Sequence, residues 1–156
     1  MKTEPKLHKR LPHIEIPEHT YFITFRTHQY RILNSEEKDI ICDVIDFNKG
    51  IKYDLISYVI LPDHVHVILT PLRGKEDFHR IQDIIKSIKG FSAYRINEVS
   101  REKGSIWQAG YFDKVIRDEN DLLKKLQYIV NNPLKADVVE NIESYKWIYV
   151  RDYLER

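Results

Sequence analysis

The chain has 156 residues, of which 42% are hydrophobic and 31% are charged. This length suits one compact domain, and no segment approaches the roughly 20 apolar residues that a membrane span needs. Cys42 is the only cysteine, which excludes an intramolecular disulfide and a cysteine-rich zinc site and fits a reducing cytoplasm. With a net charge of +1, any affinity for nucleic acid must come from a local patch.

Residues 1–18 predict a polar N-terminal arm, because they contain three prolines and no long apolar run. Residues 19–156 contain no repeat or linker and predict a single domain. Within it, the aromatic and β-branched residues 21–27 predict a first strand. A helix then follows from Ser35, a good N-cap residue, to about Lys49, with apolar side chains at helical spacing.

Two further strands are expected at residues 53–61 and 64–70, and the short break at Pro62 and Asp63 suggests that they form a hairpin. A second helix is expected at residues 78–99. Its expected apolar positions are Phe78, Ile81, Ile84, Ile85, Ile88, Phe91 and Val99.

The last part of the chain predicts a strand at residues 112–116 and a helix at 119–131, capped by Asp118 and ended by Pro133. The element order β-α-β-β-α-β with one more C-terminal helix predicts an α+β fold of the ferredoxin-like or RRM-like type. Its antiparallel sheet would carry helices on one face, a central third strand, and the final helix across the open face. This order is common among unrelated domains, so it does not establish function. The aromatic residues of the tail, expected to pack on the domain, are Tyr145, Trp147, Tyr149 and Tyr153.

His64-Val65-His66 begins the third predicted strand. Side chains alternate across a strand, so both histidines share one face, about 6.6–6.8 Å apart. Two imidazoles at this spacing can lean onto one metal ion at roughly 2.0–2.2 Å each. By itself the pair is better explained as two polar residues on the solvated face of a half-buried strand. A functional interpretation therefore needs a partner elsewhere in the chain.

Tyr128 provides that partner. At about 100° per residue it lies roughly 160° from the apolar stripe of its helix, where a core tyrosine would not be. Asn132 follows one turn later on the same face, and its side-chain oxygen can serve as a third metal ligand. Lys125, three residues earlier, can contact a phosphate or favour the phenolate. The alternative for Tyr128 is an ordinary exposed tyrosine on a solvated face.

A phenol has an ordinary pKa near 10 and is a weak nucleophile at neutral pH. Attack on a phosphodiester becomes feasible when a divalent cation polarises the phosphate and orients the scissile bond. Two neutral histidines and an amide oxygen would leave coordination positions for phosphate oxygens and water. The product would be a 5′-phosphotyrosine link and a free 3′-OH.

With these motifs in order, the chain resembles the single-tyrosine HUH transposases, and most closely the branch of REP-associated tyrosine transposases. The resemblance extends over roughly residues 19 to 150 and includes the first strand, which ends in Arg26. The segments that carry it are LPDHVHVIL at 61–69, WQ at 107–108, YFD at 111–113, IR at 116–117 and YIVNNPLKA at 128–136.

The resemblance implies a metal site made by His64 and His66 and completed by Asn132, with Tyr128 as the nucleophile. Some relatives have Gln at the position of Asn132. It also implies Mg²⁺ or Mn²⁺, single-stranded DNA with a hairpin or palindromic repeat as substrate, and cleavage and rejoining without a high-energy cofactor. A homodimer that exchanges catalytic helices is one possible assembly, and a monomer is the other.

Further DNA contacts are expected from positive side chains and one aromatic ring. Trp107 can stack on a base, although a lone tryptophan more often packs in a core. Tyr111 is a rival nucleophile, but it precedes a predicted strand and has no amide one turn away. The basic candidates for phosphate contacts are Arg26, Lys86, Lys89, Arg117 and Lys125.

Two other functions stay open at this point. A domesticated relative could bind DNA hairpins in a sequence-specific way without cutting them, although the presence of all three motif elements argues against lost catalysis. A structural metal or interaction domain of ferredoxin-like type is the third interpretation, and it would need neither DNA nor catalysis.

Overall fold

The computed structural model describes residues 20–135 and 144–151, so the predicted arm at 1–18 and Tyr153 lie outside the described part. No helix in this part is long and apolar enough to cross a membrane. The elements in chain order are β1 (Tyr21–Arg26), the 3-10 turn η1 (His28–Tyr30), α1 (Ser35–Phe47), β2 (Tyr53–Ile60), β3 (His64–Pro71), α2 (Ile81–Ser100), β4 (Phe112–Val115), α3 (Glu119–Lys135) and β5 (Ile148–Val150).

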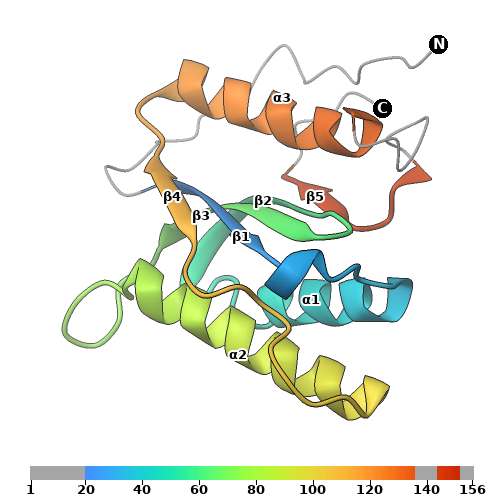
Figure 1. Cartoon of the computed structure of the whole chain (residues 1–156). Coiled ribbons are helices and arrows are strands. Elements are labelled where there is room, and N and C mark those ends of the chain that lie inside the picture. The colour runs from blue at the N-terminus through green and yellow to red at the C-terminus, as the bar shows by residue number, and fades with distance from the viewer. Residues whose placement is uncertain (1–19, 136–143, 152–156) are drawn as a thin grey trace.

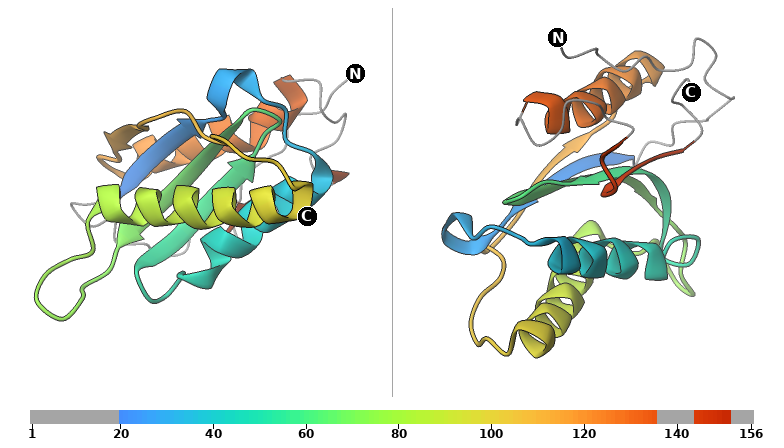
Figure 2. Two further views of the ribbon diagram at one scale, coloured as in Figure 1. Left: turned by 60° about the horizontal axis from the view of Figure 1, so that its bottom comes forward. Right: turned by 90° about the vertical axis from the view of Figure 1, so that its right-hand side faces the viewer.

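The five strands form one antiparallel sheet in the order β4-β1-β3-β2-β5. Helices α1 and α2 cover one face, and α3 lies across the other, so the molecule has three layers (Figures 1 and 2). The predicted ferredoxin-like order, the β2–β3 hairpin, the central place of β3 and the final helix on the open face are confirmed.

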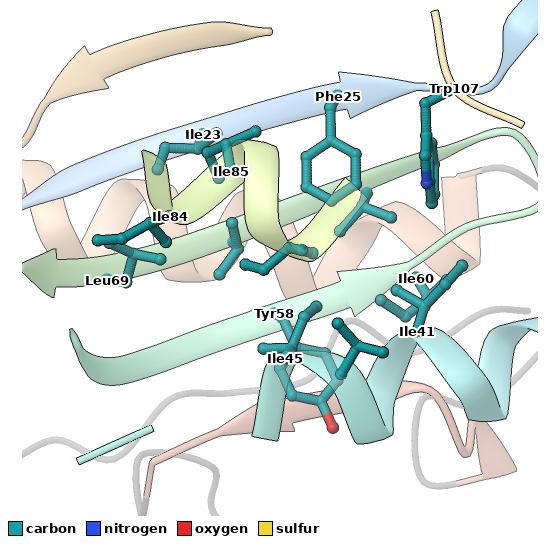
Figure 3. Packing of buried hydrophobic residues seen from close by; sticks show 14 of the residues in the cluster. Ile23, Phe25, Ile41, Ile45, Tyr58, Ile60, Leu69, Ile84, Ile85 and Trp107 are labelled. Atoms are coloured by element: carbon teal, nitrogen blue, oxygen red, sulfur yellow. The ribbon is translucent and has the colours of Figure 1, made fainter. Parts of the chain in front are cut away.

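The alternation of side chains along β3 divides the interior into two cores. Val65, Val67 and Leu69 pack in the core under α1 and α2, part of which Figure 3 shows. Ile68 packs instead with Leu126 and other apolar side chains of α3. His66 lies on the same face of β3 as Ile68, so the layer beneath α3 contains the histidine side of the strand.

Strand β5 is a feature that the sequence did not predict, because three residues are too few for a clear pattern. It pairs with β2, and the preceding Tyr145 is buried with its ring 5.5 Å from that of Trp147. The Trp147 indole N–H also donates to Asp39 of α1 at 2.8 Å. The expectation that the tail aromatics pack on the domain is confirmed for the described residues.

Two predicted helix ends were wrong. Helix α1 is capped by Asn34, not by Ser35: the Asn34 side chain accepts from the Glu37 backbone N–H, and Glu37 accepts from that of Asn34. Helix α3 continues through Pro133 to Lys135. Pro133 and Leu134 are buried there, and this tertiary packing holds the last turn although proline cannot donate a backbone hydrogen bond.

Helix α2 departs from its predicted apolar stripe. Ile84, Ile85 and Ile88 are buried as expected, but Phe91 and Val99 are 61% and 49% exposed. Phe78, predicted to begin this helix, lies before it and is 48% exposed. Helical spacing alone did not separate the side chains that face the sheet from those beside them on the helix surface.

The Asn34 cap can be tested by substitution. Asn34→Ala removes a side-chain acceptor from a helix N-terminus, and we expect the free energy of unfolding in urea to fall by about 1 kcal/mol. Ser35→Ala is the matched control and should change it by less than about 0.5 kcal/mol. A larger loss for Ser35→Ala than for Asn34→Ala would show that the cap is assigned to the wrong residue.

Candidate active site

His66 lies in the centre of the sheet, where β3 runs beside β1. Its strand partner is Thr24, whose hydroxyl is 2.7 Å from His66 Nδ1. The ring is 3% exposed, and its other nitrogen, Nε2, is buried without a hydrogen-bond partner among the described residues. Burial lowers the pKa of His66 to about 3, with further lowering by the charges of His64 and Arg26. The ring is therefore neutral at physiological pH.

His64 lies beside His66 at the start of β3, with the two ring centroids 4.9 Å apart. It is partly exposed, and its Nδ1 is 2.7 Å from a carboxylate oxygen of the preceding Asp63. Each histidine thus has Nδ1 engaged by a neighbouring oxygen. This arrangement fixes the ring and leaves Nε2 as the atom for an external ligand, as in many metal-binding histidines.

Helix α3 places Tyr128 over the histidines. Its ring centroid is 5.3 Å from that of His66 and 6.0 Å from that of Phe22, and the residue is 45% exposed. The predicted position off the apolar stripe is confirmed, since Leu126 and Ile129 on either side are buried. Two segments more than 60 positions apart in the sequence therefore meet at one point.

Asn132, predicted as a third metal ligand, is hydrogen-bonded within its own helix in this structure. Its side-chain nitrogen donates to the backbone carbonyl of Tyr128 at 3.0 Å, which holds the amide along the helix surface. Within the described part of the chain, no hydrogen bond joins it to either histidine. Its role as a third metal ligand therefore stays a prediction.

A hollow of about 780 Å³ opens between α3, β1 and the segment before β4. It contains His66 and Tyr128 together with Arg26 and Lys125, two of the basic residues expected to contact DNA. The full lining is Phe22, Thr24, Phe25, Arg26, His66, Gln108, Ala109, Gly110, Tyr111, Phe112, Lys124, Lys125 and Tyr128. The hollow is thus wide enough for an extended ligand and has a positive side.

The basic candidates lie at different distances from this hollow. Lys125 is inside it, 3.7 Å from Asp121 and with its ammonium over the Phe22 ring. Arg117 does not line it; the side chain is 75% exposed and 3.8 Å from Asp121. Lys86 does not line it either, and lies on α2. Arg26 and Lys125 therefore have the best positions for a phosphate at the site.

Trp107 and Lys89 have internal contacts in this structure. Trp107 is 7% exposed, meets Phe25 edge to face at 4.9 Å (Figure 3) and donates its indole N–H to Ser92. This position matches the packing alternative for Trp107, whose ring is buried against Phe25. The Lys89 ammonium donates to the carbonyls of Gln108 and Gly110, both at 2.7 Å. Lys89 thereby holds the segment that forms one wall of the hollow.

Several residues of the site were missed in the sequence. Asp63 and Lys124 adjoin predicted residues, so nearness in sequence was a usable signal for both. Thr24 gave no signal, because its contact with His66 depends on the register between β1 and β3. The wall at residues 108–112 likewise depends on how the segment returns from α2 to the sheet (Figure 1).

Comparison with known proteins agrees with this geometry. The family described as transposase IS200 like matches residues 16–132. The chain belongs to this family of IS200-like transposases. The REP-associated tyrosine transposase of Escherichia coli is 24% identical in sequence to this chain. The match covers 81% of this chain and 73% of that protein. A Haemophilus influenzae protein assigned as a REP-associated tyrosine transposase is 28% identical, over 81% and 77%.

Solved structures show the same fold. A REP-associated tyrosine transposase bound to a REP hairpin superposes with a TM-score of 0.68 and 20% identity, over 90% of this chain and 82% of that one. A Deinococcus radiodurans protein described as a transposase gives a TM-score of 0.50 and 25% identity, over 78% and 96%. The family's fold, predicted from the order of elements, is therefore confirmed.

The buried His66 predicts a specific loss of stability in acid. Its folded pKa of about 3 lies below the ordinary 6.5, so the unfolded chain binds a proton first as the pH falls. The resulting stability is complete above pH 6.5 and decreases toward pH 3, by up to about 1.4 kcal/mol per pH unit. His66→Gln should flatten the fall in unfolding free energy between about pH 6.5 and 5 in metal-free urea titrations. Parallel curves for variant and wild type would contradict a buried neutral ring.

Proposed function

We propose that the protein cleaves and rejoins single-stranded DNA through a 5′-phosphotyrosine link to Tyr128, with Mg²⁺ or Mn²⁺ at His64 and His66. One observation carries the proposal: the Tyr128 ring lies 5.3 Å from the ring of His66, whose buried Nε2 has no partner among the described residues. An unsatisfied buried nitrogen costs free energy, so its place beside an exposed tyrosine calls for an external ligand.

The residues present fit a divalent cation in part. His66 can donate Nδ1–H to Thr24 and keep a lone pair on Nε2, while Asp63 orients His64 in a similar way. The described residues contain no group of three or more His, Cys, Asp and Glu side chains that could hold a metal by themselves. Two histidines therefore suit a site completed by Asn132 and by oxygen atoms of the substrate. The cation would supply polarisation and orientation of the phosphate.

In the proposed reaction Tyr128 Oη attacks the phosphorus as the bond from phosphorus to the 3′ oxygen breaks. The tyrosine gives up its proton and the departing 3′ oxygen gains one, so no external source of energy is consumed. The link keeps the bond energy for rejoining.

The substrate follows from the charges and the relatives together. Arg26, Lys124 and Lys125 line the hollow and provide positive charge for a strand of phosphates. Because the solved relative is described as bound to a REP hairpin, we take a hairpin or palindromic repeat as the partner. His66 and Tyr128 meet within one chain in this structure, so the proposed chemistry does not need a homodimer.

The second candidate function is that of a DNA-hairpin-binding protein that cuts nothing. The same basic hollow would serve it, and the hydrogen bond of the Asn132 amide to the backbone of Tyr128 is compatible with it. An exposed tyrosine would also suit a binding protein, but the buried Nε2 of His66, without a partner among the described residues, has no explanation under this alternative. Cleavage with a bound metal accounts for it.

A covalent-adduct assay separates the two functions. Labelled single-stranded DNA with hairpins, incubated with protein and Mn²⁺, should give a protein–DNA band that survives denaturing electrophoresis. Tyr128→Phe should remove the band, because no oxygen remains to attack the phosphorus. Excess EDTA should do the same.

Tyr111→Phe is the matched control, since this tyrosine lines the same hollow. It should keep the adduct. An adduct that persists in Tyr128→Phe and disappears in Tyr111→Phe would transfer the nucleophile to Tyr111. Tight hairpin binding by the wild type without any adduct, in either metal, would favour the binding protein.

A further inference from the structure

Three hollows adjoin one another, and the segment before β4 lines the first two. The candidate active site shares Gly110 and Tyr111 with a second hollow of about 460 Å³ between that segment and α2. The second shares Lys86 and Gly90 with a third, of about 590 Å³, on the surface of α2. The second and third hollows, joined to the first through these shared lining residues, are here called the α2 track.

Gly90 in the middle of the track has no internal explanation. The chain has five glycines, and three of them, Gly50, Gly104 and Gly110, have positive φ that favours glycine. A side chain at Gly74 would approach the Asp77 carbonyl to 3.2 Å, whereas one at Gly90 would meet nothing within 4 Å. Glycine inside a helix costs roughly 0.5–1 kcal/mol relative to alanine. A ligand that approaches the α2 backbone closely would account for it.

Aromatic rings line the track on both sides of Gly90. Phe91 and Tyr94 line the third hollow and are 61% and 63% exposed. Tyr111, 37% exposed, stands where the first and second hollows join. Rows of exposed aromatic rings are typical of surfaces that bind single-stranded nucleic acid, because such rings can stack on any base.

Positive charge accompanies these rings. Lys86 lines both outer hollows and forms no ion pair with a carboxylate in the described part of the chain. Lys89 supports the wall between the first two hollows by its bonds to Gln108 and Gly110. Asp83 is the one acidic side chain in the lining of the outer two hollows. A polyanion therefore suits the track better than an acidic peptide does.

We propose that the α2 track binds the single-stranded DNA that flanks the cleaved bond. Bases stack on Tyr111, Phe91 and Tyr94, the backbone crosses α2 at Gly90, and Lys86 faces the phosphates. This proposal rests on the proposed function, because it takes the strand to enter the track from the hollow that contains Tyr128. The residues that the track shares with the hollow of Tyr128, Gly110 and Tyr111, favour DNA over a second protein chain, because one strand can lie along both surfaces.

The test uses the full-length Tyr128→Phe protein, so that binding is measured without cleavage. The probes are fluorescein-labelled thymidine oligonucleotides lengthened one nucleotide at a time, and the readout is the Kd from fluorescence anisotropy. Phe91→Ala should weaken binding of the long oligonucleotides about tenfold and leave that of the short ones unchanged. Phe47→Ala is the matched control, since Phe47 is 80% exposed at the end of α1, away from the track.

Gly90→Gln gives an independent outcome. It should raise the urea midpoint of unfolding, since glutamine is the better helix former, and still weaken binding of the long oligonucleotides about tenfold. A variant that is more stable but binds less well cannot owe its defect to misfolding. Unchanged Kd values in both Gly90→Gln and Phe91→Ala would overturn the proposal.

A second copy of the chain is the competing occupant. If Phe91→Ala changes the sedimentation of the DNA-free protein and not the Kd, the face belongs to a dimer and the track proposal is wrong. Failure of the proposed function would instead appear as absence of a covalent adduct in the wild-type protein. The two failures are therefore distinguishable, because the track is measured in a protein that cannot form the adduct.

Discussion

The hydrogen bond between Thr24 and His66 is the contact on which the rest of the site depends. It crosses the β1–β3 ladder at the centre of the sheet and engages Nδ1. Nε2, which is buried without a hydrogen-bond partner among the described residues, is therefore the nitrogen left for a ligand. Burial keeps the ring neutral, and a neutral ring can donate a lone pair. A one-residue slip in register would turn His66 into the opposite core and remove the site.

Helix α3 supplies the second half of the arrangement through ordinary packing. Its buried residues Leu122, Leu126 and Ile129 pack against the sheet and so fix the orientation of the helix about its own axis. In this orientation Tyr128 lies beside His66. The helix therefore does not need a polar contact with the histidines to position its tyrosine. The Asn132 side chain is hydrogen-bonded to the backbone carbonyl of Tyr128 in this structure. This is compatible with a metal ligand that joins the site only when the substrate brings further oxygen atoms.

Much of this could be predicted from periodicity. Alternation along His64-Val65-His66 and the helical position of Tyr128 were sufficient to place three side chains on facing surfaces, because each pattern is local. Contacts set by register or by the course of a loop were not predictable, as Thr24 and the 108–112 wall show. The exposed Phe91 was mistaken for a core residue for a related reason: periodicity shows amphipathicity but not which partner covers each face.

Pulsed electron paramagnetic resonance of the Mn²⁺-loaded protein tests the central claim most directly. Nitrogen atoms bound to the ion give hyperfine couplings, so the measurement identifies the ligands without relying on activity. The account predicts couplings from two histidines in the wild type, with one lost in His66→Gln and the other in His64→Gln. A Mn²⁺ signal without nitrogen coupling, or with the same couplings in His66→Gln, would contradict a metal site at these histidines.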